Sequence, residues 1–157
     1  MKPLSAVLLM PLEFSRKTYR LADQAGIKLD ALAVNNLDSL ERAFSKDFDL
    51  LLAFGTGVIV PRWIIEKPRL LALNVHAASP QYPGRDPHHF AIYDGAKQYG
   101  ATMHYMTQSV DAGSIVDIEL FSVQPDTTPS RLLDLANEAG WTLIERFFRK
   151  FLAFGAP

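Results

Sequence analysis

Residues 70–76 read LLALNVH, and this stretch decides the fold. A short aliphatic run that becomes polar only at its end predicts a strand buried on both faces. Successive strand side chains point to opposite faces, so Asn74 and His76 are expected to project to the same one. Open α/β sheets bind ligands beyond the carboxyl ends of their strands, which makes these two side chains the first candidates for function.

A second informative stretch is VDAG, residues 110–113, which predicts a turn between two later strands. Asp111 in this turn would complete a trio of amide, imidazole and carboxylate with Asn74 and His76. The residues alone are also compatible with purely structural roles. The amide and imidazole fit a hydrogen-bonded strand end, and the aspartate fits an ordinary turn residue beside Gly113.

Strands and helices are expected to alternate along the chain. The pattern predicts strands over residues 4–10, 27–34, 49–54, 70–76, 101–106 and 114–123. It predicts helices over residues 16–25 with Ser15 as N-cap, 39–45 with a capping box at Asp38, 61–65, 86–95 with Asp86 as N-cap, and 129–151. This order favours a single α/β domain over residues 1–157, built on a mostly parallel, doubly wound, Rossmann-like sheet.

The composition excludes several classes of function. Sixteen Lys and Arg face seventeen Asp and Glu, so nothing attracts a polyanion, and no nucleic-acid partner is expected. The chain has no cysteine, which excludes disulfides, a thiolate nucleophile and cysteine-ligated zinc. No run of eighteen apolar residues occurs, and the N-terminal apolar run, residues 6–10, is too short for a signal peptide. We therefore expect no membrane association and a cytoplasmic location.

Other catalytic schemes find little support in the residue pattern. A metal site would recruit His76, His88, His104 and Asp111, but their spacing matches no zinc motif, so we expect no metal. No Gly-x-Ser-x-Gly elbow supports a serine nucleophile. The first strand-to-helix turn, residues 10–14, has no glycine and carries a carboxylate, which disfavours a bound pyrophosphate. His104 is expected to face the same crevice or to occupy a satisfied core position.

Residues 49–123 resemble the folate-dependent formyltransferases. The resemblance rests on LNVH at 73–76, SPQYPG at 79–84, TMHY at 102–105 and VDAGSIV at 110–116. The segments YPG at 82–84, FAIY at 90–93 and YGAT at 99–102 look most similar to enzymes that formylate amino sugars.

The resemblance implies roles for individual residues. Asn74, His76 and Asp111 would be catalytic, and the formyl donor would be 10-formyltetrahydrofolate. The pterin of that donor would be held largely by backbone groups of Phe54, Gly55, Thr56, Gly57, Val58, Ile59, Gln108, Ser109 and Val110. His88 matches a histidine near the substrate crevice in the family.

The expected activity is formyl transfer to a primary amine of a small acceptor, with an amino sugar as one candidate. Asn74 and a protonated His76 would hydrogen-bond the developing oxyanion, and Asp111 would accept the amine proton. Two rivals stay open: a hydrolase that gives the formyl group to water, and a folate-binding module without turnover. A homodimer is compatible with all three.

Overall fold

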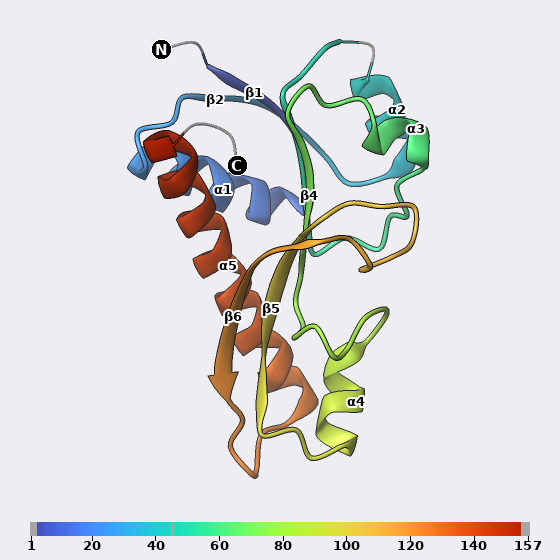
Figure 1. The fold of residues 1–157 in the computed structure, drawn as a ribbon, viewed down its shortest axis with the longest axis vertical. Helices are drawn as coiled ribbons and strands as arrows, with labels where there is room; N and C mark the ends of the chain where they lie inside the picture. Colours follow the sequence, from blue (N-terminus) through green and yellow to red (C-terminus); the bar gives the residue numbers. More distant parts are fainter. Residues whose placement is uncertain (1–2, 45, 155–157) are drawn as a thin grey trace.

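The computed structural model describes residues 3–44 and 46–154, which form one six-stranded sheet covered by helices (Figure 1). The strands are β1 (Leu4–Leu9), β2 (Leu29–Val34), β3 (Leu50–Phe54), β4 (Leu71–His76), β5 (Gln98–Tyr105) and β6 (Ile115–Ser122). Their order is β2-β1-β3-β4-β5-β6. The first four are parallel, whereas β5 runs antiparallel to β4 and β6 antiparallel to β5. The predicted mostly parallel, Rossmann-like sheet is confirmed.

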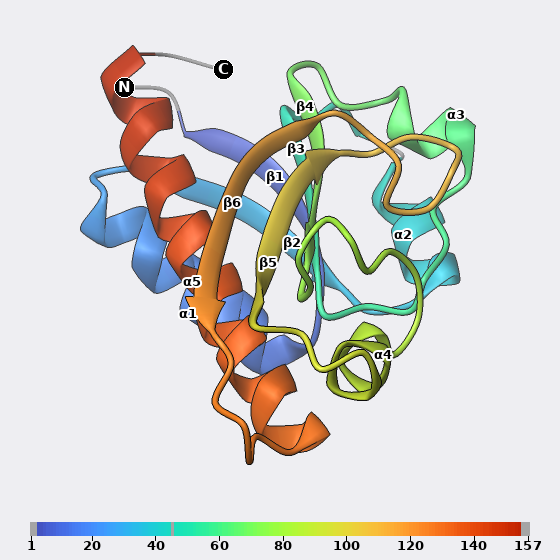
Figure 2. The same cartoon turned by 60° about the horizontal axis from the view of Figure 1, so that its bottom comes forward.

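Helices cover both faces of the sheet, as Figure 2 shows. α1 (Leu12–Gln24) and α5 (Pro129–Phe154) lie on one face, and α2 (Leu37–Ala43) and α3 (Arg62–Ile65) on the other. α4 (Pro87–Tyr93) follows the loop after β4. Because successive side chains of a strand point to opposite faces, each strand contributes residues to two hydrophobic cores, one on each face of the sheet. Along β3, Leu50 and Leu52 pack in the core with α1 and α5, while Leu51 and Ala53 pack in the core with α2 and α3.

β4 places its polar residues on one face. Leu71, Leu73 and Val75 are buried in the core with α1 and α5, and the residues between them are only half-buried. Asn74 and His76 therefore share the opposite face, as the alternation predicted. Both stand at the carboxyl end of the strand, next to the antiparallel β5.

Two helices begin earlier than predicted. α1 starts at Leu12 with Pro11 at the N-cap, and the Ser15 hydroxyl donates to the Pro11 carbonyl from inside the first turn. α2 is capped by Asn36, whose side chain accepts the Ser39 N–H, so Asp38 lies inside the first turn. The local sequence does not separate Asn36 from Asp38, because Asn and Asp are equally good N-cap residues. The predicted end of α2 at Ser45 lies outside the described residues.

Asp86 is confirmed as the N-cap of α4, although without a capping side chain, whereas the start of β5 differs from expectation. Asp86 stands at the N-cap of α4 in the left-handed region, at φ 53°, and its side chain makes no capping hydrogen bond. β5 begins at Gln98 and not at residue 101. The sequence pattern places Gly100 before the strand, but the residue lies inside it. A Cβ at Gly100 would overlap the Glu119 carbonyl oxygen, so the glycine marks a close backbone approach and not a strand end. No helix in the described part of the chain is long and apolar enough to cross a lipid bilayer.

Candidate active site

A cleft of about 680 Å³ lies beyond the carboxyl ends of β3 and β4. Its lining includes the trio predicted to be catalytic, Asn74, His76 and Asp111. It also includes nearly all residues predicted to hold the formyl donor: Gly55, Thr56, Gly57, Val58, Ile59, Gln108, Ser109 and Val110. Phe54 is the exception, because its side chain is fully buried against Phe14 and Trp141 and does not line the cleft.

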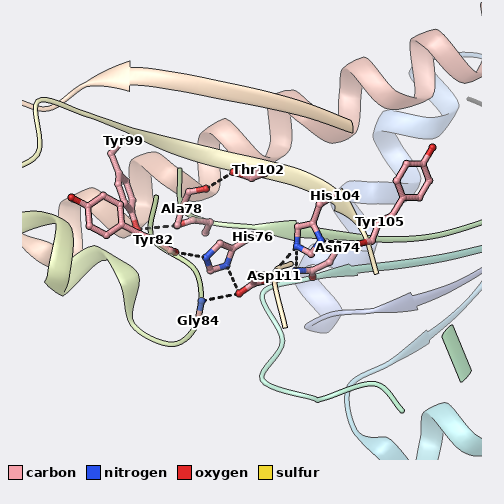
Figure 3. Close-up of polar contacts among 11 residues, drawn as sticks. Asn74, His76, Ala78, Tyr82, Gly84, Tyr99, Thr102, His104, Tyr105 and Asp111 are labelled. Atoms are coloured by element: carbon pink, nitrogen blue, oxygen red, sulfur yellow. Dashed lines mark hydrogen bonds and ion pairs between the residues drawn. The ribbon is translucent and has the colours of Figure 1, made fainter. Parts of the chain in front are cut away.

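Asp111 is the hub of the polar contacts in the cleft. Its Oδ1 accepts a hydrogen bond from Asn74 Nδ2 at 3.3 Å and lies 3.3 Å from His104 Nε2. Its Oδ2 accepts the Gly84 backbone N–H at 2.9 Å and lies 3.6 Å from His76 Nδ1. Figure 3 shows the carboxylate between the His76 ring on one side and the Asn74 and His104 side chains on the other. The predicted trio therefore converges, although Asp111 comes from a distant turn.

The His76 ring has one nitrogen fixed by the backbone. Nε2 lies 2.8 Å from the Tyr82 carbonyl oxygen, which can only accept, so Nε2 carries a proton. Nδ1 is left facing the Asp111 carboxylate at 3.6 Å, beyond normal hydrogen-bond length. Nδ1 is therefore the nitrogen available to a reacting group.

His104 is a fourth member of the cluster. Its Nδ1 donates to the Tyr105 carbonyl at 2.9 Å, and its Nε2 lies 3.2 Å from Asn74 Nδ2 as well as near Asp111. The sequence offered two positions for His104, and the structure combines them, since the ring is buried and also borders the cleft. It arrives there because His104 pairs directly with Asn74 in the β4–β5 register. Only knowledge of that register could have placed it.

The electrostatics of the cluster favour an ionised carboxylate. Burial by itself raises the pKa of Asp111, but hydrogen bonds from His104 and Gly84 and the charge of nearby His76 bring that pKa below its usual value. Burial lowers the pKa of His104, but its hydrogen bonds to Asp111 and to the Tyr105 carbonyl outweigh burial and raise that pKa. When His104 is protonated, its Nε2 and the Asn74 amide both donate to one carboxylate oxygen.

The loop after β4 is anchored to the sheet. Thr102 Oγ1 donates to the Ala78 carbonyl at 2.8 Å, and the Tyr99 hydroxyl donates to the Ala77 carbonyl at 3.3 Å (Figure 3). These bonds fix the start of the segment that delivers the Tyr82 carbonyl to His76 and the Gly84 N–H to Asp111. The orientation of the catalytic candidates thus depends on β5.

The turn that carries Asp111 requires a glycine at position 113. A Cβ at position 113 would overlap the Tyr105 carbonyl oxygen, so no other residue fits without moving the chain. Asp111 itself adopts the left-handed conformation, with φ 53°. The turn therefore brings the carboxylate back over β4 through a tight approach to β5 and a strained backbone.

Several residues that line the cleft were not predicted. Arg85, Asp86 and Pro87 come from the segment that leads into α4, and Leu133 and Asn137 come from α5. Phe14 from α1 also lines the cleft. No local pattern marks these positions, because their role depends on how α1, α4 and α5 pack around the strand ends.

No group of three or more His, Cys, Asp or Glu side chains is arranged to hold a metal ion in residues 3–44 and 46–154. The cluster instead provides what acyl transfer needs. Asn74 has a second N–H beyond the one directed at Asp111, His76 has a free Nδ1, and a carboxylate held ionised lies beside both.

Comparisons with known proteins show the family to which this chain belongs. The family model described as Formyl transferase matches residues 13–146. The methionyl-tRNA formyltransferase of Bacillus thuringiensis strain Al Hakam is 33% identical over 127 residues, which are 80% of this chain and 40% of that protein. The chain thus spans about two-fifths of the length of the curated relatives it matches.

Solved structures of low sequence identity share the fold. A phosphoribosylglycinamide formyltransferase from Anaplasma phagocytophilum matches with TM-score 0.78 and 19% identity, covering 97% of this chain and 88% of that one. An N-formyltransferase from Helicobacter canadensis matches with TM-score 0.78 and 14% identity, covering 99% and 66%. A formyltetrahydrofolate deformylase from Pseudomonas syringae matches with TM-score 0.81 and 16% identity, covering 97% and 62%. Given the match of the family model over most of its length, this chain belongs to the formyl transferase family.

Proposed function

We propose that this protein transfers a formyl group from 10-formyltetrahydrofolate to the primary amine of a small acceptor. The observation that carries the proposal is the convergence of Asn74, His76 and Asp111 at one cleft. In the proposed reaction the donor, a co-substrate, supplies an activated formyl group. The product is a formamide, and the proton lost by the amine ends on the tetrahydrofolate nitrogen that leaves.

The lining of the cleft fits a flat, partly apolar donor. Ile59 and Val110 are large hydrophobic residues that are 70% and 57% exposed, and both line the cleft. Nothing lies within 4 Å of a Cβ built at Gly57, so the chain there leaves open space against which a ring could lie. Apolar walls with a few polar groups are typical of small-molecule sites. The related N-formyltransferase from Helicobacter canadensis was solved with folinic acid and dTDP-3-aminofucose, which supports a folate-type donor.

Asn74 and His76 would stabilise the oxyanion that forms when the amine attacks the formyl carbon. One Asn74 N–H is directed at Asp111, and with His104 protonated, so that its Nε2 cannot accept, the other N–H is left for the oxygen. His76 Nδ1, in its protonated form, would be the second donor, because Nε2 is held by the Tyr82 carbonyl. A preorganised donor of this kind contributes about 3 kcal/mol to the transition state.

Asp111 would act on the proton and on the charge. Its lowered pKa keeps it ionised at neutral pH, so it can stabilise the positive charge on the attacking amine. A weak base of this kind accepts the amine proton only transiently and passes it on to the leaving nitrogen. His104 and Gly84 hold the carboxylate in place for this step.

The proposal can be tested with purified protein, 10-formyltetrahydrofolate and a panel of primary amines, by following tetrahydrofolate release and formamide formation. Formyl transfer to at least one amine, lost in His76→Ala, is the expected result. Formate release in the absence of amine would instead identify a hydrolase, the activity named for the Pseudomonas syringae protein of the same fold. Donor binding without either product would identify a binding module.

The donor side of the cleft has its own test. Val110→Ser should raise KM for the donor about tenfold, because burying an aliphatic side chain against a ligand contributes on the order of 1–3 kcal/mol. Leu120→Ser is the matched control, since Leu120 is also an exposed aliphatic residue but lies on β6 outside the cleft. An equal effect of both substitutions would argue against a donor site at Val110.

A further inference from the structure

The side chains proposed to be catalytic mostly hydrogen-bond one another and the nearby backbone. Other residues of the cleft must therefore bind the acceptor. Asp111 is held by Asn74, His104 and Gly84, and His76 is held by Tyr82. The segments predicted to hold the donor mix aliphatic, glycine and polar residues. A separate polar part of the cleft is the segment that enters α4, where Arg85, Asp86 and His88 all contribute to the lining.

Asp86 is held in an unfavourable conformation at this segment. Its φ of 53° and ψ of 41° are left-handed, and the following Pro87 disfavours helical conformations before it. No contact of the Asp86 side chain among the described residues offsets this backbone strain. The side chain does not cap α4, and it forms no ion pair within the described part of the chain. Strained residues at a cleft are commonly tied to binding.

His88 carries an independent observation. Its side chain is only 8% exposed, and Nδ1 is buried without a hydrogen-bond partner among the described residues. A buried polar atom without a partner destabilises a protein, and such groups call for an explanation. Burial and the neighbouring His89 lower the pKa of His88, against the opposing influence of Asp86. The ring is therefore neutral at pH 7 and keeps one N–H and one acceptor nitrogen.

We propose that Asp86 and His88 form the acceptor subsite, and that they select an amine that arrives as a cation and carries hydroxyl groups. The Asp86 carboxylate would bind the ammonium group on entry, and the neutral His88 ring would hydrogen-bond a hydroxyl. This subsite rests on the proposed function, because it assigns the acceptor of that reaction. It places recognition of the acceptor on the segment that enters α4, which is distinct from the segments proposed to hold the donor.

The test compares glucosamine with N-acetylglucosamine, which has the same ring hydroxyls but no charge. Direct binding to the full chain, measured by saturation-transfer NMR and calorimetry, needs no turnover. Glucosamine should bind at least tenfold more tightly than N-acetylglucosamine, since a charge-assisted hydrogen bond is at stake. Asp86→Asn should abolish this preference. Asp30→Asn, the same charge change on exposed β2 outside the cleft, should leave it intact. Equal binding of the two sugars by the wild type, or no binding of either, would overturn the proposal.

His88→Phe separates a binding role from a structural one. Removing a buried nitrogen without a partner should leave the melting temperature equal or higher. If His88 binds a hydroxyl, the same variant should weaken both sugars by a similar factor of about ten. Full binding in a stable His88→Phe protein would remove His88 from the subsite.

Turnover distinguishes failure of the subsite from failure of the proposed function. Formyl transfer with an unchanged acceptor KM in Asp86→Asn would overturn the subsite and leave the function standing. Glucosamine binding that depends on Asp86, with no transfer from 10-formyltetrahydrofolate to any amine, would overturn the function and leave a cation subsite.

Discussion

The backbone N–H of Gly84 donates to the Asp111 carboxylate at 2.9 Å and so ties the loop after β4 to the turn between β5 and β6. The two segments meet directly beside the His76 ring, whose Nε2 is fixed by Tyr82 of the same loop. A single carboxylate thus acts as the joint between two segments that are distant in sequence. Its charge and its position contribute separately, and substitutions can separate them.

Asp111→Asn should keep the position and lose the charge. The amide oxygen can still accept the Gly84 N–H, so the fold should be kept, and the melting temperature should fall only by the contribution of the lost charge. Turnover should fall by about 10²–10⁴, the usual contribution of a positioned acid–base group. Asp111→Ala should lose the same activity and also some stability, because it leaves the Gly84 N–H and the His104 ring without their partner. Steady-state kinetics and thermal melts would check this, and near wild-type turnover in Asp111→Asn would contradict the role.

Asp111 should make stability depend on pH at the acid end. A carboxyl whose pKa is lower in the folded than in the unfolded state contributes stability above the unfolded pKa, near 3.8. That contribution is lost as pH falls through the lower folded pKa. The stability difference between wild type and Asp111→Asn should therefore shrink below about pH 4. Chemical denaturation from pH 2.5 to 7 would measure it.

His104 should act in the opposite direction. Its folded pKa is raised above 6.5, so its contribution is fully present below pH 6.5 and is lost as pH rises through the folded value. The stability advantage of wild type over His104→Gln should therefore be larger at pH 6 than at pH 9. A constant difference across this range would show that the His104 charge does not couple to folding.

Gly113→Ala should damage the site through the backbone alone. The added Cβ would overlap the Tyr105 carbonyl oxygen, so the turn must move away from β5 and carry Asp111 with it. We expect a loss of stability of about 1–3 kcal/mol and a loss of turnover larger than stability explains. Gly57→Ala is the control for stability alone, since nothing lies within 4 Å of a Cβ there; its turnover is not compared, because Gly57 belongs to the proposed donor site. Unchanged activity in Gly113→Ala would show that the turn adapts freely.

Asn74→Ala should lower kcat by about 10²–10³ without unfolding the protein, as expected for loss of one oxyanion donor. Asn35→Ala removes an exposed amide that does not line the cleft and should have no effect on kcat. Comparable rates for Asn74→Ala and the wild type would place the oxyanion elsewhere.

A chelator should leave activity unchanged. The proposed reaction uses hydrogen-bond donors and a carboxylate, and it assigns no step to a metal ion. Assays before and after treatment with EDTA, with zinc added back, would check this. Inactivation that zinc reverses would return His76, His104 and Asp111 to consideration as ligands.

The sequence by itself determined the architecture, and it named three side chains that the fold brings together at one cleft. Aliphatic runs, glycine turns and helical periodicity are local signals, and they were enough for the six strands and for the shared face of Asn74 and His76. Cap positions were less certain, because Asn36 and Asp38 offer the same chemistry two residues apart.

Only the tertiary structure decided how the site is assembled. His104 joins Asn74 through the register of two antiparallel strands, and strand register is a property of paired segments that no single segment encodes. The same holds for the orientation of the His76 ring, in which the Tyr82 carbonyl, six residues away in a folded loop, holds Nε2 and leaves Nδ1 facing Asp111. Asp86 by itself reads only as a helix N-cap, and the resemblance alone placed His88 near the crevice. Packing adds what the sequence could not give, a strained Asp86 and a buried His88 nitrogen without a hydrogen-bond partner among the described residues.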